Sequence, residues 1–368
     1  MKQTLAQTRY PKDAEFGLFS LTHGDPLGSF IGRFSIRSPL YAVAIAATLS
    51  FSAALLASFE GSLYNPDLSL DLLHDIGWWN QFLLAFPTLL FISGSYFGAF
   101  PKTLRGLADS GVIQATEQQW KKVRRLTHAK LKNLTFILLP YVGGITAAFL
   151  TTNVLDSNSA WFSADDYIAG WLIPPHAFFL YFFMTYLALR LYTAYLVLKL
   201  LFSFSVNIQP FHADGCGGLG SLRDQSKKLY WGMIAFGVIA GLGVLTNSLV
   251  YGVALFSLHN GLMMFAYFLL TGIAFFLPLY ALSGSMQLAK QNLIDSINAR
   301  YRTLNENSES RSDRTLNAEQ KEDLKALTQL HRTARSMKVW PFDKDSLVKF
   351  GFAMTTPAFV VFLGMVFQ

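Results

Sequence analysis

Long apolar segments with almost no charge recur along the whole chain and limit what it can fold into. A helix that crosses the hydrocarbon core of a bilayer needs about 20 mostly apolar residues. Six segments meet this requirement: Pro39–Phe59, Gln81–Phe100, Leu134–Leu150, Trp171–Leu201, Leu229–Phe256 and Gly261–Leu282. A seventh, Leu347–Phe367, is long enough but carries Lys349. The pattern predicts an all-α polytopic helical membrane protein with six or seven transmembrane helices.

The composition excludes several other classes of protein. Charged residues make up 14% of the 368 residues, whereas soluble globular domains contain about 25%. So few charges cannot cover a water-facing surface, so an ordinary soluble enzyme is excluded. The single cysteine, Cys216, excludes a disulfide framework and a multi-cysteine metal site. The net charge of +7 is unevenly distributed along the chain, and we expect the lipid bilayer rather than a nucleic acid as partner.

Lysine and arginine are confined to alternate connections between the apolar segments. The parts 1–38, 101–133, 202–228 and 283–346 contain five, eight, three and eleven of them, whereas 60–80, 151–170 and 257–260 contain none. Cytoplasmic loops carry this excess of positive charge. We therefore expect a multi-pass protein of the inner (plasma) membrane with its N-terminus in the cytoplasm.

The same map predicts four parts of the chain. Residues 1–38 form a cytoplasmic or interfacial segment, 39–282 a six-helix transmembrane domain, 283–346 a cytoplasmic helical hairpin, and 347–368 a transmembrane or membrane-associated helix. The hairpin rests on two apolar stripes at helical spacing, one beginning at Ile294 and one at Leu324. The polar run Asn305–Arg314 between them is interpreted as a loop.

Acidic residues mark the connections that are expected outside. Two interpretations remain open. The positive-inside bias could simply leave these loops without cations, or the carboxylates could form a negative vestibule that concentrates cations at a pore mouth. The candidate vestibule residues are Asp71, Asp75, Asp165 and Asp166.

Polar residues inside the predicted spans are few. No Asp or Glu lies in any of them, which counts against a transporter coupled to protons or sodium. His176, Asn247 and Ser248 could line a polar path or bond neighbouring helices. Arg190 lies late in a long segment, and we expect it at the cytoplasmic headgroups. Gly237 and Gly241 form a small-xxx-small pair, which lets helices approach closely.

One glycine-rich loop could carry chemistry. It could be a tight turn, a site for a small anionic ligand at a helix start, or a metal site built on His212, Asp214 and Cys216. No second cluster supplies a fourth metal ligand, so we predict neither metal nor cofactor. The candidate ligand-binding residues are His212, Asp214, Gly215, Gly217, Gly218, Gly220 and Arg223. No local catalytic arrangement accompanies them, so an enzyme finds little support.

Two short stretches carry a resemblance. His212–Gly220, with its His-x-Asp pattern followed by glycines, and the Trp-Pro-Phe-Asp segment Trp340–Asp343 resemble patterns in uncharacterised bacterial polytopic inner-membrane proteins. This resemblance implies a bacterial inner membrane and brings no activity or site residue with it.

Three functions follow as hypotheses. The first is a homo-oligomeric ion channel or pore-forming effector that is gated or regulated from the cytoplasmic side. The second is a signalling or scaffold component that binds a cytoplasmic protein through the hairpin 283–338. The third is an inner-face membrane enzyme that uses His212 and Asp214.

Overall fold

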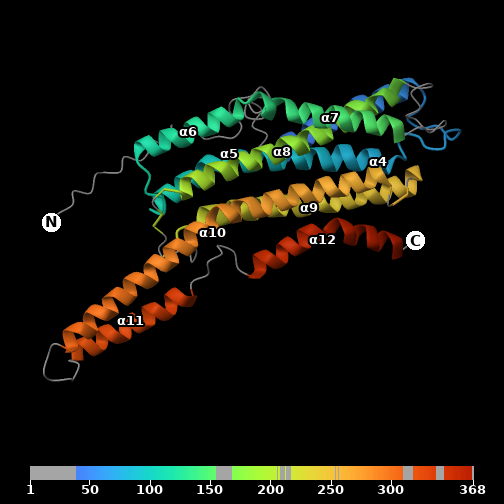
Figure 1. Ribbon diagram of the computed structural model, residues 1–368. Coiled ribbons are helices and arrows are strands. Elements are labelled where there is room, and N and C mark those ends of the chain that lie inside the picture. The colour runs from blue at the N-terminus through green and yellow to red at the C-terminus, as the bar shows by residue number, and fades with distance from the viewer. Residues whose placement is uncertain are drawn as a thin grey trace.

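The computed structural model shows a bundle of long helices with one helical arm projecting from it (Figure 1). It describes residues 39–154, 168–204, 206–207, 212, 217–252, 254–255, 257–309, 318–336 and 344–366. Within these ranges the elements are α3 (Pro39–Phe59), α4 (Ile76–Trp79), the π-helix η2 (Asn80–Ala85), α5 (Phe86–Asp109), α6 (Glu117–Leu131), α7 (Leu134–Val154), the 3-10 helix η3 (Ile168–Leu172), α8 (Ile173–Phe202), α9 (Gly220–Tyr251), α10 (Leu258–Glu309), α11 (Ala318–Ser336) and α12 (Lys344–Val366). The predicted all-helical class is confirmed for this part of the chain.

Among the described residues, five helical segments are long and apolar enough to cross a membrane. They are Leu40–Phe59, Ile76–Asp109, Glu117–Leu150, Ile168–Phe202 and Gly220–Val250. Two shorter apolar stretches, Asn260–Phe276 of α10 and Phe350–Val366 of α12, accompany them. These lengths agree with the predicted helical membrane protein in its general form.

The centre of the bundle is filled by large side chains from α5, α8 and α9. Phe97, Phe100 and Leu104 on α5 are fully buried, as are Leu187 and Leu198 on α8. Helix α10 packs on α8 and α9, α12 packs along α9, and α7 packs along α8. The interior of a single copy is therefore a packed core at this level of the bundle.

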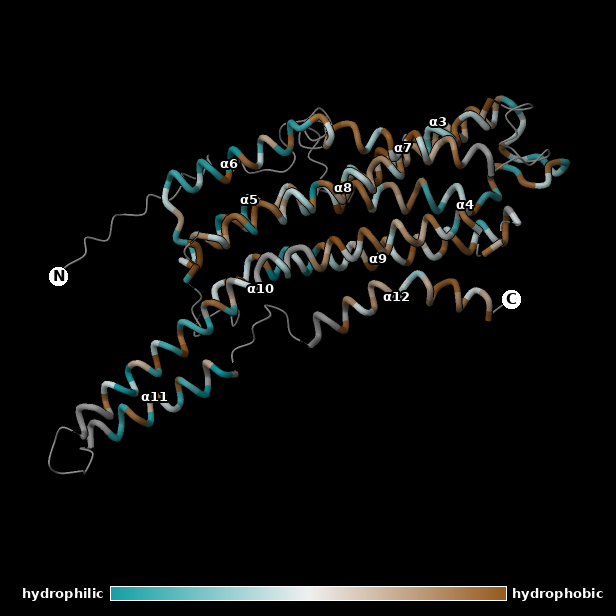
Figure 2. The backbone as a smooth tube through the Cα atoms, viewed as in Figure 1, coloured by the Kyte–Doolittle hydropathy of each residue, from teal (hydrophilic) through white to brown (hydrophobic). Residues whose placement is uncertain are grey.

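The outside of the bundle is apolar as well. Helix α3 turns Ala42, Ala46 and Ala57 inward and leaves Phe59 82% exposed, while Phe149 on α7 is 68% exposed. Figure 2 shows hydrophobic residues along the bundle and hydrophilic residues gathered on α6, α11 and the distal part of α10. Apolar patches of this extent mark a surface that faces lipid or another protein.

Helix α10 continues without a break from the bundle into the arm. Its 52 residues make it about 78 Å long at 1.5 Å per residue. The predicted loop at Asn305–Arg314 is wrong for its first five residues, because α10 extends to Glu309. Adding a residue to an existing helix costs far less than starting a new one, so the polar residues after Leu304 remain helical. Residues 310–317 lie outside the described part of the chain.

The arm consists of residues 284–309 of α10 together with α11, and its two helices pack against each other (Figure 1). Ile297 of α10 and Leu327 and Ala334 of α11 form a small apolar core. The side chain of Lys290 donates a hydrogen bond to the carbonyl oxygen of Arg335 at 2.8 Å. The two helices run antiparallel, as the predicted hairpin requires.

Candidate functional site

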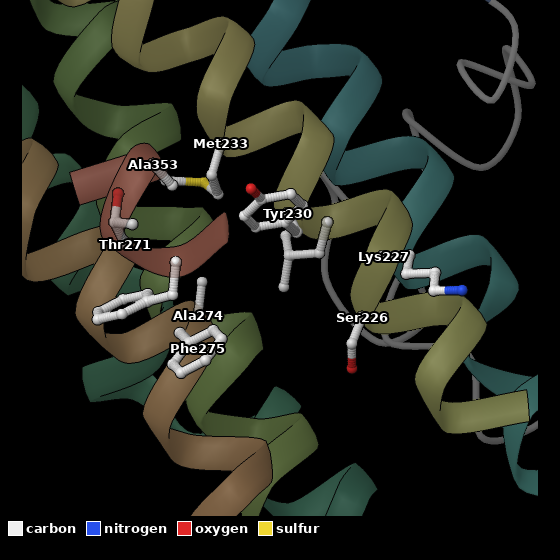
Figure 3. A pocket seen from close by; sticks show the side chains of 10 residues that line it. Ser226, Lys227, Tyr230, Met233, Thr271, Ala274, Phe275 and Ala353 are labelled. Carbon is white, nitrogen blue, oxygen red and sulfur yellow. The ribbon is translucent and has the colours of Figure 1, made fainter. Parts of the chain in front are cut away.

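A small crevice lies where the arm leaves the bundle, between α9, α10 and α12 (Figure 3). It encloses about 40 Å³ and has Ser226 and Lys227 of α9 among its lining residues. Its deeper lining is apolar, and it includes Phe275 of α10, whose ring stacks on that of Phe350 at 4.0 Å between centroids. This volume holds a few waters at most. The crevice is therefore a packing gap at the base of the arm rather than a site for a small-molecule ligand.

A hydroxyl group ties three helices together beside this crevice. The hydroxyl of Tyr267 on α10 lies 3.1 Å from the carbonyl oxygen of Met233 on α9 and 2.5 Å from that of Ala353 on α12. Gly237 makes room for it, since a Cβ atom there would lie 2.4 Å from the Tyr267 hydroxyl. The close approach predicted for the Gly237–Gly241 pair is thus observed, with Gly241 facing Pro357 of α12.

A second polar link joins α5 to α9 inside the bundle. The side-chain amide of Gln225 donates to the carbonyl oxygen of Tyr96 at 3.0 Å, and its oxygen accepts from the hydroxyl of Thr103. The hydroxyl of Ser221 also donates to the carbonyl oxygen of Thr103, at 3.3 Å. The roles of Gln225, Thr103 and Ser221 could not be predicted from the sequence, because nothing in their local pattern distinguishes them from the exposed polar residues around Arg223.

Arg190 is buried between helices. It is 5% exposed, and its guanidinium group stands over the ring of Tyr186 at 4.8 Å. This burial depends on which face of α8 carries Arg190, and neighbouring helices decide that. Its expected position at the depth of the cytoplasmic headgroups stays a prediction.

The glycine-rich loop is described only in part. Asp214 and Gly215 lie outside the described residues, whereas His212 is half-buried and Gly220 begins α9. Gly217 and Gly218 are buried with φ angles of +68° and +92°. These positive φ values favour glycine because they bring the Cβ of other residues too close to the backbone.

The described glycines are also needed for packing. A Cβ atom at Gly218 would lie 2.3 Å from Cγ2 of Val112, in the connection between α5 and α6. That connection also binds the segment before the loop, because the backbone N–H of Asn207 donates to the carbonyl oxygen of Val112 at 2.8 Å. Arg223 pairs with the carboxylate of Asp224 at 3.5 Å. This geometry favours the tight turn, and ligand binding by the loop stays a prediction.

Asn247 serves as a link between helices. Its side-chain nitrogen donates to Oδ1 of Asn260 at 3.0 Å, and the nitrogen of Asn260 donates to the carbonyl oxygen of Ala254 at 3.1 Å. These bonds close the turn between α9 and α10. Ser248 is half-buried near the end of α9. The hydrogen bonds of Asn247 therefore favour a role in bonding neighbouring helices over a role in lining a polar path.

The two described candidates for an acidic vestibule are buried. Asp71 is 5% exposed and Asp75 is 1% exposed. The backbone N–H of Trp78 donates to Asp75 at 2.9 Å, which caps α4. Asp71 accepts hydrogen bonds from the backbone N–H groups of Asn65 and His74 at 3.3 and 2.9 Å. Both carboxylates therefore hold the 60–75 segment together, which counts against an open vestibule made of them. Asp165 and Asp166 lie outside the described residues.

His176 lies in the first turn of α8 and lines a large cavity at the opposite end of the bundle from the arm. Its ring centroid is 4.1 Å from that of Phe82 and 5.3 Å from that of Trp78. Within the described residues, no group of three His, Cys, Asp or Glu side chains is placed to hold a metal ion.

No protein-family model, no curated protein and no solved structure matches this chain. The resemblance to uncharacterised bacterial inner-membrane proteins therefore stays a prediction.

Proposed function

We propose that this protein is a multi-pass membrane signalling or scaffold component that presents its arm to a cytoplasmic protein. The observation that carries the proposal is the unbroken α10 helix. The first three turns of α10 are bonded to α9 through Asn260 and to α9 and α12 through Tyr267, and its far part packs on α11. The helix continues past Pro278 and connects the bundle directly to the arm.

We further propose seven crossings with the N-terminus in the cytoplasm. The order of contacts supports the seventh, because Gly241 of α9 faces Pro357 of α12 while Leu245 meets Gly364, one to two turns further along both helices. The two helices are therefore parallel and extend alongside each other. Since α10 leads into the arm between them, α12 has to return through the same layer. The distribution of lysine and arginine supplies the orientation.

The channel hypothesis finds less support in the geometry. The interior polar residues Asn247 and Gln225 are bonded to neighbouring helices, and large side chains fill the centre of the bundle. A channel built from this chain would have to place its pore between copies. Ion flux through purified protein in liposomes tests this alternative, and flux that depends on Asn247 would favour it over the scaffold.

Site-specific photo-crosslinking in cells tests the proposed role of the arm. A photoreactive amino acid placed at Arg300, Tyr301 or Lys321, which are exposed on the arm, should give one discrete adduct with a protein partner. The matched control is Ile297, which is buried between the two helices of the arm and should give none. Adducts absent from every exposed arm position, or equally strong from the exposed Phe149 of α7, would contradict the proposal.

Spin labels test whether α10 is a rigid connection. With Cys216→Ser as background, labels at Gly261→Cys and Lys321→Cys should show one narrow distribution of distances. Leu288→Pro should broaden it, because proline removes one backbone hydrogen bond and kinks the helix. An equally broad distribution without the Leu288→Pro substitution would show that α10 does not connect the two parts rigidly.

A further inference from the structure

A cavity of about 530 Å³ lies between α3, η2 and α8, at the end of the bundle that carries the 60–75 segment. We call it the His176 cavity. Cavities that hold small molecules typically measure about 300–1,000 Å³. Apart from His176 and Ser52, its walls are apolar and strongly aromatic: Leu56, Phe59, Trp78, Phe82, Phe86 and Phe179 are among the lining residues.

The cavity opens toward the apolar outside of the bundle. Four of its lining residues are themselves exposed large hydrophobic residues: Leu49, Leu55, Phe59 and Phe179. In a bilayer, that opening faces the hydrocarbon rather than water. A molecule that enters it therefore has to be soluble in the membrane.

The imidazole of His176 presents a polar atom to this wall. His176 is 8% exposed, and its Nε2 atom is buried without a hydrogen-bond partner among the described residues. The hydroxyl of Ser52, on the α3 side of the cavity, donates instead to the carbonyl oxygen of Leu49 at 2.9 Å. Burying a polar group without a hydrogen bond is unfavourable. Such a group in a cavity wall is accounted for if a bound molecule completes the bond.

The local backbone is arranged around this imidazole. The π-helix η2 carries Phe82, whose ring lies 4.1 Å from the ring of His176. The first residue of η2, Asn80, donates its side-chain N–H to the carbonyl oxygen of Ile239 on α9 at 3.2 Å. Single π-helical turns are rare and are frequently found at functional sites. In this protein the π-helix η2 contributes Phe82 to the lining of the cavity.

The far wall is held in place by Glu60 at the end of α3. Its two carboxylate oxygens accept hydrogen bonds from the backbone N–H groups of Ile168 and Ala169 in η3, at 3.0 and 2.9 Å. This contact fixes the end of α3 to η3, the segment that leads into α8. The cavity is thus formed before any molecule binds, which lowers the entropy cost of binding.

We infer that the His176 cavity binds a neutral, membrane-soluble molecule that has a flat apolar ring and one oxygen atom paired with Nε2 of His176. The aromatic walls suit a ring, because aromatic faces and edges stack favourably at 4.5–7 Å. A neutral imidazole offers a donor or an acceptor, so a hydroxyl or a carbonyl oxygen can complete the bond. A charged molecule is disfavoured, since burying an unpaired charge in apolar surroundings is far more costly than burying a neutral group.

The inference rests on the membrane placement proposed above but not on the arm. Crosslinking from the arm can fail while binding in the cavity succeeds, and the reverse also holds. The two results therefore separate the inference from the proposed function.

Photolabelling of the protein in lipid nanodiscs tests the inference. The probe is a benzophenone that carries one alkyl tail, because it combines a flat ring, a carbonyl oxygen and a photoreactive centre. Labelling should saturate and map to residues in the 78–86 and 172–179 segments. The diphenylmethane with the same tail lacks the oxygen, and it should compete about tenfold less well, the difference expected for one hydrogen bond.

His176→Phe is the decisive variant, because it keeps an aromatic ring and removes the nitrogen. It should raise the half-saturating concentration of the benzophenone about tenfold and abolish the preference over the diphenylmethane. His176→Gln, whose amide still offers hydrogen bonds, should retain part of that preference. Leu56→Trp should narrow the cavity without touching the imidazole and prevent saturable labelling, which keeps the test valid if His176→Phe fails to fold.

Two outcomes would overturn the inference. The first is labelling that never saturates and spreads over the lipid-facing residues of α7, which would mean that only acyl chains enter the cavity. The second is an unchanged preference for the carbonyl compound in His176→Phe, or unchanged labelling in Leu56→Trp.

Discussion

The hydroxyl oxygen of Tyr267 on α10 lies 2.5 Å from the carbonyl oxygen of Ala353 on α12. The two residues are 86 positions apart in the chain, with the arm between them. This bond joins the helix that enters the arm to the helix that returns from it. The hydroxyl group therefore adds a direct bond to the packing of α12 against α9 and α10.

Tyr267→Phe removes that hydroxyl and keeps the ring. We expect it to lower the free energy of unfolding by about 1 kcal/mol, the size of a hydrogen bond between membrane helices. Thermal unfolding in detergent measures the effect. A matched change on an exposed tyrosine, Tyr41→Phe on α3, should leave the unfolding temperature unchanged, and equal effects from both variants would argue against the link.

Gly237→Ala on α9 should disturb the packing of α9 against Tyr267 of α10. The added Cβ would lie 2.4 Å from the Tyr267 hydroxyl, so α9 and α10 have to separate, at a cost of about 1–3 kcal/mol. Gly272→Ala on α10 is the control, because nothing lies within 4 Å of a Cβ there. Alanine is the better helix former by about 1 kcal/mol, so the control should be neutral or stabilising. A stabilising Gly237→Ala would contradict the packing.

Glu60→Gln tests the contact that holds α3 to η3. Glutamine keeps the length of the side chain, but its NH₂ group faces one of the two backbone N–H donors. Hydrogen exchange of the Ile168 and Ala169 amides should accelerate about tenfold or more, as expected for loss of a hydrogen bond to a charged acceptor. The exposed carboxylate of Asp67 provides the control, and Asp67→Asn should leave both amides unchanged.

The stability of the 60–75 segment should depend on pH through Asp71. Burial by itself raises the pKa of Asp71, but hydrogen bonds from the backbone and ring of His74 and from the backbone of Asn65 outweigh it and leave the pKa below its ordinary value. Because the pKa is lower in the folded state, the unfolded state binds more protons in acid. The stabilisation is therefore fully present above about pH 4 and is lost as the pH falls through the folded pKa.

Trp79 reports on this segment, since its ring N–H donates to the carbonyl oxygen of Leu72 at 3.0 Å. In protein labelled with 5-fluorotryptophan, unfolding followed by the ¹⁹F NMR signal of Trp79 should show the acid dependence, which Asp71→Asn should remove. A destabilisation that grows as the pH rises would have the wrong sign for a carboxylate with a lowered pKa.

Accessibility labelling tests the orientation. In the Cys216→Ser background, Asp67→Cys should react with a membrane-impermeant maleimide on intact cells, whereas Lys121→Cys should react only after lysis. Both positions are exposed on the protein, so the membrane alone accounts for a difference. Reaction of Lys121→Cys from outside would overturn the proposed orientation.

The helices themselves could be predicted from short stretches of the sequence. The predicted span Pro39–Phe59 has the same bounds as α3. The predicted span Trp171–Leu201 begins within η3 and ends one residue before the end of α8. The candidate site could be predicted only in outline. His176 was selected because it is a rare ionisable residue inside a predicted span. Its aromatic neighbour Phe82, and Glu60 at the end of α3, carry no local signal of their role.

The sequence by itself determined that the protein is built of long apolar helices with a polar helical arm. This follows because a helix satisfies its own backbone hydrogen bonds, so length and hydropathy decide whether it can lie in lipid. Only the tertiary structure decided that Arg190 and Asp71 are buried, that Gln225 bonds to Tyr96, and that Tyr267 bonds to Ala353. Those contacts depend on the register and rotation of helices that are distant in the chain, and no local pattern of residues specifies either.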